Sequence, residues 1–164
     1  MGTWSRSELE TAFEHYQSEV RRACAANDWN IFADLFTEDA TYHEHLFGQF
    51  EGQDAIRAWI TSTMADFPGS SMPAFPIKWR VIDEEHGWII CDVINQMADP
   101  GDGSVHGASN ITVLHYAGDN HFSKEEDAYN PMAFMVMVKA WCRRANELGT
   151  LPPDGAAWLT SMGG

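Results

Sequence analysis

The fold is decided by residues 77–98, which read IKWRVIDEEHGWIICDVINQMA. Two runs rich in β-branched and aromatic residues flank Glu84-Glu85-His86-Gly87, a sequence that favours a tight turn. The same alternation of strand-like runs and short turns continues for two further segments downstream. Because a short connector makes consecutive strands antiparallel neighbours, the sequence predicts a four-stranded antiparallel meander. The predicted strands are Ile77–Asp83, Trp88–Ala98, Val105–Tyr116 and His121–Tyr129.

Helical periodicity dominates the residues before this meander. Ser7 and Glu10 form a capping-box pattern at the start of a helix that reaches about Ala26. Helices followed by a meander are typical of an α+β domain, which we expect to span residues 1–164 with a core over 8–148. The other predicted elements are a short helix capped by Asn27-Asp28, a bent strand pair over 40–50, a helix from Gly52 to Phe67, a helix from Pro131 to Leu148 capped by Asn130, and an appended C-terminal segment over 149–164.

Composition excludes several classes of function. The 164 residues carry a formal charge of −14 at pH 7, and a field of that sign repels nucleic-acid phosphates and anionic lipid. No apolar run reaches the roughly 20 residues of a spanning helix, and the first residues lack the apolar core of a signal peptide. Three widely spaced cysteines predict no disulfide framework. We therefore expect a cytoplasmic protein without nucleic-acid or membrane partners.

Both faces of the predicted strand Trp88–Ala98 are partly apolar. Cys91 and Val93 share one face with Asn95, and Ile90 and Ile94 lie on the other, because side chains alternate along a strand. A sheet with one face in water would have one polar face. We therefore predict a homodimer through the outer sheet face, with tight packing inside one chain as the alternative.

The order of these elements carries a family resemblance. Together with the sequences LFTEDATY at 35–42 and GQDAI at 52–56, it resembles the nuclear-transport-factor-2-like, or SnoaL-like, superfamily. The resemblance covers about Glu8 to Leu148 and implies a cone (a cystatin-like α+β roll), in which a curved antiparallel sheet wraps around a long helix and a deep apolar pocket opens at one end. The superfamily includes ketosteroid isomerases, limonene-type epoxide hydrolases, dehydratases, polyketide cyclases and proteins without chemistry, so the fold alone selects no activity.

The resemblance places four candidate catalytic residues in this pocket. Tyr42 corresponds to the water-holding tyrosine of the epoxide hydrolases. Glu44 shares its strand face and corresponds to that tyrosine's asparagine partner, or to the carboxylate base of the ketosteroid isomerases. Asp127 corresponds to the carboxylate that activates water in the epoxide hydrolases, and Asn95 stands where they have their general acid. We predict Glu44 as the principal base, Asp127 as its partner, and Tyr42 and Asn95 as groups that polarise a substrate oxygen or hold a water.

The sequence also departs from both enzyme types. Val93 stands where the epoxide hydrolases have an arginine, and Val20 and Thr112 stand where the isomerases have a tyrosine and a protonated acid. These departures argue against a standard member of either group. Tyr16 lies one helical turn before Val20 and would reach the pocket instead, whereas His106 fits either a dehydratase-type acid/base or a polar residue at an exposed strand end. The other predicted substrate-binding residues are Trp59, Asn110 and Tyr129.

A metal or cofactor is not expected in the pocket. His43 and His45 form a His-x-His pair on one strand, a pattern found in metal sites. If Tyr42 and Glu44 face the pocket, these histidines face away from it, and we expect them to be solvated or to lie in an interface. No glycine-rich sequence joins a strand to a helix as nucleotide sites require.

Two carboxylates in an apolar cavity would have their ionisation suppressed by burial and mutual repulsion. One neutral and one ionised carboxyl group suit proton abstraction beside a carbonyl, elimination or water activation. The sequence therefore predicts a cofactor-independent acid/base enzyme for a small, hydrophobic, ring-containing molecule. Isomerisation or dehydration by a lyase ranks first, and water addition by a hydrolase second. The alternatives are a non-catalytic binding protein with the same cone and an accessory subunit with a vestigial pocket.

Overall fold

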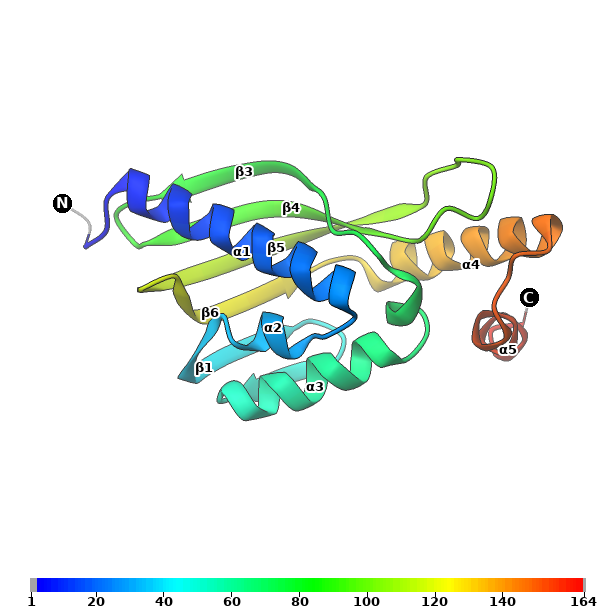
Figure 1. The fold of residues 1–164 in the computed structure, drawn as a ribbon, viewed down its shortest axis with the longest axis horizontal. Coiled ribbons are helices and arrows are strands. Elements are labelled where there is room, and N and C mark those ends of the chain that lie inside the picture. The colour runs from blue at the N-terminus through cyan, green and yellow to red at the C-terminus, as the bar shows by residue number, and fades with distance from the viewer. Residues whose placement is uncertain (1–2, 164) are drawn as a thin grey trace.

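Six strands form one curved sheet, with the N-terminal helices on one side of it and the C-terminal helices at one end (Figure 1). This computed structural model describes residues 3–163. The elements in chain order are α1 (Arg6–Ala26), α2 (Asn30–Ala33), β1 (Phe36–Glu44), β2 (Gly48–Glu51), α3 (Gln53–Ala65), the 3₁₀ turn η1 (Gly69–Ser71), β3 (Ile77–Asp83), β4 (Trp88–Gln96), β5 (Gly107–Gly118), β6 (His121–Ala128), α4 (Pro131–Leu148) and α5 (Pro153–Ser161).

The α+β class and the meander are confirmed, but the sheet is mixed rather than wholly antiparallel. The strand order is β2-β1-β6-β5-β4-β3, and β3 to β6 pair antiparallel as predicted. β1 pairs with β6 in parallel. The reason is connectivity: β1 and β6 are joined through α3 and the whole meander, and so long a crossover leaves the parallel orientation open. This parallel pair brings Tyr42 opposite Glu125 and Glu44 opposite Asp127.

A bulge interrupts the regular alternation of β6. Tyr116 of β5 is paired with Phe122, and the preceding residue, His115, is paired with Lys124, so Ser123 is an extra residue in the ladder. As a result, Phe122 is fully buried before the bulge, and Glu125, three residues later, is buried as well. The bulge therefore shifts the inward-facing positions of β6 by one residue.

Helix α1 covers the concave side of the sheet with the apolar stripe that the sequence predicts. Leu9 and Phe13 are fully buried, and Tyr16 is almost so. The helix begins earlier than the predicted capping box, because Ser5 Oγ accepts a hydrogen bond from the Glu8 amide at 3.2 Å. Asn27, predicted to start the next helix, instead ends α1 in the left-handed conformation.

The C-terminal helices pack against the segment that follows α3 and against the end of the β4–β5 region. Helix α4 begins as predicted, with the Asn130 side chain accepting hydrogen bonds from the first amides of the helix. The Trp141 indole donates a hydrogen bond to the Ala98 carbonyl at 2.7 Å. Phe67 contacts both Trp141 and Trp158, with ring centroids 6.0 and 5.6 Å apart. The appended segment therefore forms part of the wall at this end of the sheet. Within residues 3–163, no helix is sufficiently long and apolar to traverse a bilayer.

Candidate active site

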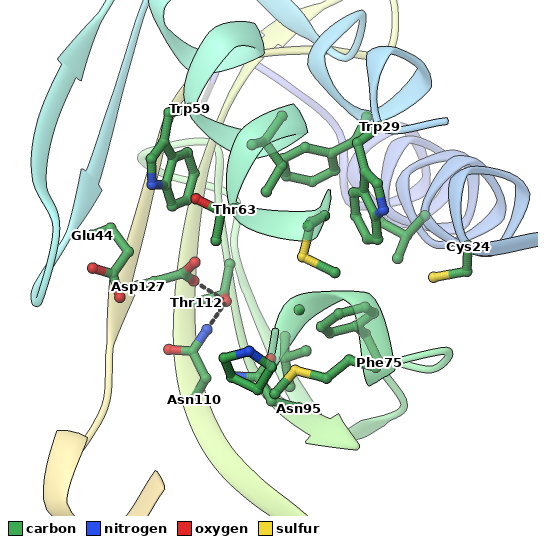
Figure 2. A pocket seen from close by; sticks show the side chains of 18 of the residues that line it. Cys24, Trp29, Glu44, Trp59, Thr63, Phe75, Asn95, Asn110, Thr112 and Asp127 are labelled. Atoms are coloured by element: carbon green, nitrogen blue, oxygen red, sulfur yellow. Dashed lines mark hydrogen bonds between the residues drawn. The ribbon is translucent and has the colours of Figure 1, made fainter. Parts of the chain in front are cut away.

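A cavity of about 1540 Å³ lies between the sheet, α1, α3 and the C-terminal helices. It exceeds the ~300–1,000 Å³ of ordinary small-molecule pockets. Its walls are mostly aromatic and aliphatic, whereas polar groups converge on one side, where Asp127, Thr112 and Asn110 lie together (Figure 2). An apolar cavity with a few convergent polar groups is the usual form of a binding or active site. Aromatic residues of its lining include Trp29, Phe32, Phe50, Trp59, Phe75, Phe134 and Trp158.

All but one of the residues predicted for the site line this cavity. The exception is His106, which lies in the connection before β5, with its imidazole 3.2 Å from the Ser104 hydroxyl. His106 is half-buried at this position, one residue before the start of β5. The predicted residues that do line the cavity are Tyr16, Val20, Tyr42, Glu44, Trp59, Val93, Asn95, Asn110, Thr112, Asp127 and Tyr129.

Two buried carboxyl groups form the centre of the polar side. Glu125 and Asp127 are 2% and 8% exposed. The Tyr42 hydroxyl bridges them, lying in a short hydrogen bond with Asp127 Oδ2 and 3.1 Å from Glu125 Oε1. Tyr16 donates to Glu125, with its hydroxyl 3.0 and 3.2 Å from the two carboxyl oxygens. Thr112 donates to Asp127 Oδ1 at 2.5 Å. These contacts fix both carboxyl groups against the aromatic wall.

The sequence analysis missed Glu125. Its position two residues before Asp127 could have identified it, because strand residues at that spacing share a face of the sheet. The buried Phe122 hides this signal, because regular alternation cannot turn both Phe122 and Glu125 inward. Only the bulge at Ser123 reconciles the two residues, and bulges have no reliable sequence pattern of their own.

Burial raises the pKa of both central carboxyl groups. Desolvation raises the pKa of Glu125 well above its usual range and the Asp127 charge raises it further, although hydrogen bonds from Tyr16 and Tyr42 act in the opposite direction. Desolvation also raises the pKa of Asp127, but hydrogen bonds from Thr112, Tyr42 and Asn110 act in the opposite direction. The pKa of Glu125 is thus shifted further above its usual range than that of Asp127, so Asp127 is the first of the two to ionise. Burial raises the pKa of the Tyr16 and Tyr42 hydroxyls as well, so both remain neutral donors.

Glu44 is the third buried carboxylate of the cavity lining and is anchored differently. Its Oε2 accepts hydrogen bonds from the Leu46 and Phe47 amides at 2.8 and 2.5 Å, which ties it to the turn between β1 and β2. The side chain is 5% exposed, and its charge contributes to the raised pKa of Asp127. After desolvation, Glu44 is also the main cause of the raised pKa of the Tyr129 hydroxyl.

Two polar atoms in the cavity wall have no hydrogen-bond partner among the described residues. They are Nε1 of Trp59, a donor, and Oδ1 of Asn110, an acceptor. The Asn110 amide is oriented by its other atom, since Nδ2 donates to Thr112 Oγ1 at 3.3 Å and Thr112 in turn donates to Asp127. Trp59 is held by Phe50 and Tyr42, each with a centroid distance of 4.7 Å. A buried polar group without a partner is costly, and both of these atoms belong to residues that line the cavity.

Asn95, Val20 and Val93 complete the predicted set without joining the acidic network. Asn95 lies on β4 and lines the cavity, but among the described residues it has no hydrogen bond to either central carboxyl group. Val93 is 8% exposed and Val20 is half-buried, so both supply apolar wall. Of the lining residues described, Arg21 is the one basic group, and the interior therefore carries an acidic excess.

The sequence matches one protein-family model, that of the SnoaL-like domain, over residues 18–116. The chain belongs to the SnoaL-like domain family. The matched region runs from α1 to β5 and includes the cavity residues Tyr42, Glu44 and Thr112. Glu125 and Asp127 lie beyond it. Among curated proteins, none matches this SnoaL-like chain significantly.

Solved structures share the fold of this SnoaL-like protein at low sequence identity. A protein with a ketosteroid isomerase-like fold from Catenulispora acidiphila, in complex with trimethylamine, is 17% identical with a TM-score of 0.58, and the match covers 74% of this chain and 90% of that one. An NTF2-like protein from Anabaena variabilis is 13% identical with a TM-score of 0.58, covering 79% and 95%. TerC, co-crystallised with polyporic acid, is 10% identical with a TM-score of 0.54, covering 77% and 97%. These similarities confirm the predicted fold.

Proposed function

We propose that this SnoaL-like protein is a cofactor-independent acid/base enzyme that isomerises or dehydrates a small, hydrophobic, ring-containing molecule. One observation carries the proposal: the Tyr42 hydroxyl joins two buried carboxyl groups of unequal acidity, Glu125 and Asp127, at the wall of an aromatic cavity. Groups whose pKa values are separated by their surroundings can take up and return a proton near neutral pH.

Asp127 is the base in this proposal. It is the more exposed of the two carboxyl groups, and its oxygens, which accept hydrogen bonds from Tyr42 and Thr112, keep a lone pair for the substrate. Asp127 removes a proton from a carbon next to a substrate carbonyl and becomes neutral. It then returns that proton either to another carbon, which is an isomerisation, or to a leaving hydroxyl group, which departs as water. Glu125 stays protonated beside it and, through Tyr42, limits the build-up of charge.

We propose for Glu44 a different role from the one the sequence suggested. The prediction made it the principal base, but its Oε2 already serves two backbone amides of the β1–β2 turn. Two amide donors on one oxygen fix the carboxylate of Glu44 against the turn. We assign Glu44 to holding the turn and to raising the pKa of Asp127 through its charge.

The cavity also indicates the kind of substrate. Its acidic interior disfavours anions and accepts neutral or cationic molecules. A ligand that satisfies the unpartnered wall atoms places an acceptor, such as a carbonyl, against Trp59 Nε1 and a donor, such as a hydroxyl, against Asn110 Oδ1. Two proteins of similar fold are described in complex with trimethylamine and with polyporic acid, which supports a small organic ligand.

The test is a panel of cyclic hydroxyketones, aromatic diols, sterols and terpenoid epoxides, screened first by thermal shift and then for conversion. Asp127→Asn should lower turnover by roughly 10²–10⁴-fold, the usual contribution of a positioned base, with little change in ligand affinity. Glu44→Gln keeps an oxygen for the turn amides and should lower turnover by roughly tenfold or less. A larger loss in Glu44→Gln than in Asp127→Asn would return the role of base to Glu44.

A non-catalytic binding protein is the second candidate. The observation that favours it is the full engagement of the carboxyl pair with Tyr16, Tyr42 and Thr112, since a satisfied buried network also serves to fix the shape of a pocket. Tight binding of several panel compounds without conversion of any of them would favour this function over catalysis.

A further inference from the structure

The outer face of the sheet, directly behind the carboxyl pair, carries a second cluster of chemistry-bearing side chains. His43 on β1 and His45, the first residue after β1, alternate with Tyr42 and Glu44, so their imidazoles point away from the cavity. The parallel pairing of β1 with β6 places Glu126 opposite His43. The sequence analysis considered the two histidines alone, because Glu126 lies more than eighty residues away and reaches them only through this pairing.

We propose that His43, His45 and Glu126 form a binding site for one divalent transition-metal ion of the Zn²⁺ type. Their donor atoms all lie within 4.8 Å of one another. Glu126 Oε1 is 2.9 Å from His45 Nε2 and 3.5 Å from His43 Nδ1. Metal–ligand bonds of ~2.0–2.1 Å at tetrahedral angles place donor atoms about 3.3 Å apart. The three side chains therefore need only small rotations to surround an ion.

The donor set selects the class of ion. Two imidazoles and one carboxylate suit Zn²⁺, Cu²⁺ and Ni²⁺, whereas Mg²⁺ and Ca²⁺ prefer oxygen ligands throughout. The side chains of His43, His45 and Glu126 are 41%, 39% and 30% exposed, so an ion can enter from solvent and complete its coordination with water. Lys124 Nζ lies 3.3 Å from Glu126 Oε2, the other carboxylate oxygen. This lysine orients the carboxylate and leaves Oε1 for the metal. Its own positive charge, however, lies close to the ion and opposes binding.

The site would join the strands that carry the central carboxyl groups. His43 stands between Tyr42 and Glu44 on β1, and Glu126 stands between Glu125 and Asp127 on β6. An ion held by both strands adds a cross-link at the parallel pair, on the opposite face from the cavity. Because the ion binds only the folded arrangement of these three ligands, its binding stabilises the folded chain.

The experiment is calorimetric titration of the untagged protein with ZnCl₂ near neutral pH, alongside thermal unfolding with and without zinc. Wild type should bind one ion per chain, and a hundredfold excess over Kd should raise the melting temperature by about 5–10 °C. His43→Ala and Glu126→Ala should each weaken binding at least roughly tenfold, since even outer-shell changes at metal sites cost ~10–100-fold. His121→Ala removes an exposed histidine elsewhere on β6 and should leave zinc binding unchanged, as should Cys24→Ser, which removes a competing thiol.

A second measurement protects the test against variants that fold poorly. Cu²⁺ bound to wild type should show electron paramagnetic resonance couplings from two imidazole nitrogens, and His45→Ala should show one. Absence of zinc binding at 100-fold molar excess, or one-to-one binding that persists in both His43→Ala and Glu126→Ala, would overturn the proposal. Zinc binding that persists in both of these variants but is lost in Cys24→Ser would assign the ion to the Cys24 thiol.

Discussion

Glu125→Gln tests the physical basis of the carboxyl pair without a substrate. Burial and the Asp127 charge raise the pKa of Glu125 above that of an ordinary glutamate, so folding near neutral pH requires this group to take up a proton. A carboxyl group whose pKa is raised in the folded state imposes no cost on folding at pH values below its unfolded-state pKa. Above that value, the free energy of unfolding falls as the pH rises towards the folded-state pKa. Glutamine resembles the protonated carboxyl group and needs no proton, so the variant avoids the penalty.

The size of the effect follows from the pH interval. An ordinary glutamate has a pKa of 4.5, and each pH unit above that value is worth about 1.4 kcal/mol, so the penalty at pH 7 cannot exceed about 3.4 kcal/mol. Glutamine disturbs the hydrogen bonds from Tyr16 and Tyr42, at a cost of about 1 kcal/mol. We expect the variant to be more stable than wild type by about 1–2 kcal/mol near pH 7, and to be equal or less stable near pH 5.

Urea unfolding of both proteins near pH 5 and pH 7 measures this difference, with a chelator present to exclude metal binding. The neighbouring Glu126→Gln is a matched control of opposite sign. The hydrogen bond from His45 lowers the pKa of Glu126, so this carboxylate contributes to stability above its unfolded pKa, and its replacement should destabilise the protein at both pH values. An equal effect of Glu125→Gln at the two pH values would refute the raised pKa and the role given to Glu125.

Four further outcomes are expected. Tyr42→Phe removes a hydrogen bond to ionised Asp127 and raises its pKa, so the acidic limb of the pH–rate profile should move to higher pH. Asn130→Ala should cost about 1 kcal/mol in urea unfolding, because the N-cap of α4 is lost, whereas Asn130→Asp should not. Gly69→Ala places a methyl group against a backbone carbonyl of α3 and should cost about 1–3 kcal/mol. Sedimentation at micromolar concentration should show a dimer that Trp79→Glu, on the exposed outer face of β3, dissociates; a monomeric wild type would contradict the interface.

The meander and the helices were predictable because their signals are local. Alternating strands with turn residues between them, and the Asn130-Pro131 cap, each depend on residues close together in the sequence. The exact ends were less predictable where two signals compete, as Ser5 and Ser7 do at the start of α1. The strand ladder beside β1 was not predictable, since no local pattern states which distant strand will pair with it or in which direction.

The residues of the candidate site likewise divide into those that the sequence could predict and those that it could not. Tyr42, Glu44 and Asp127 were found through a family resemblance and strand alternation, and the structure brings all three to one cavity. Glu125 was missed because a bulge changes which residues face inward. The anchoring of Glu44 by the turn amides also lay outside prediction, because it depends on the conformation of the few residues between β1 and β2.

The extra residue in β6 makes the acidic character of the cavity depend on one irregularity of the strand ladder. If β6 were regular after Phe122 with Ser123 retained, the next inward positions would be Lys124 and Glu126. The cavity would then exchange its two carboxyl groups for an amine and a carboxylate, while the outer face would lose the partner of His43. Deletion of Ser123 would have no such effect, because Phe122, Glu125 and Asp127 would then share the inward face by regular alternation. The length of β6 can therefore change by this one residue without altering which side chains reach the cavity.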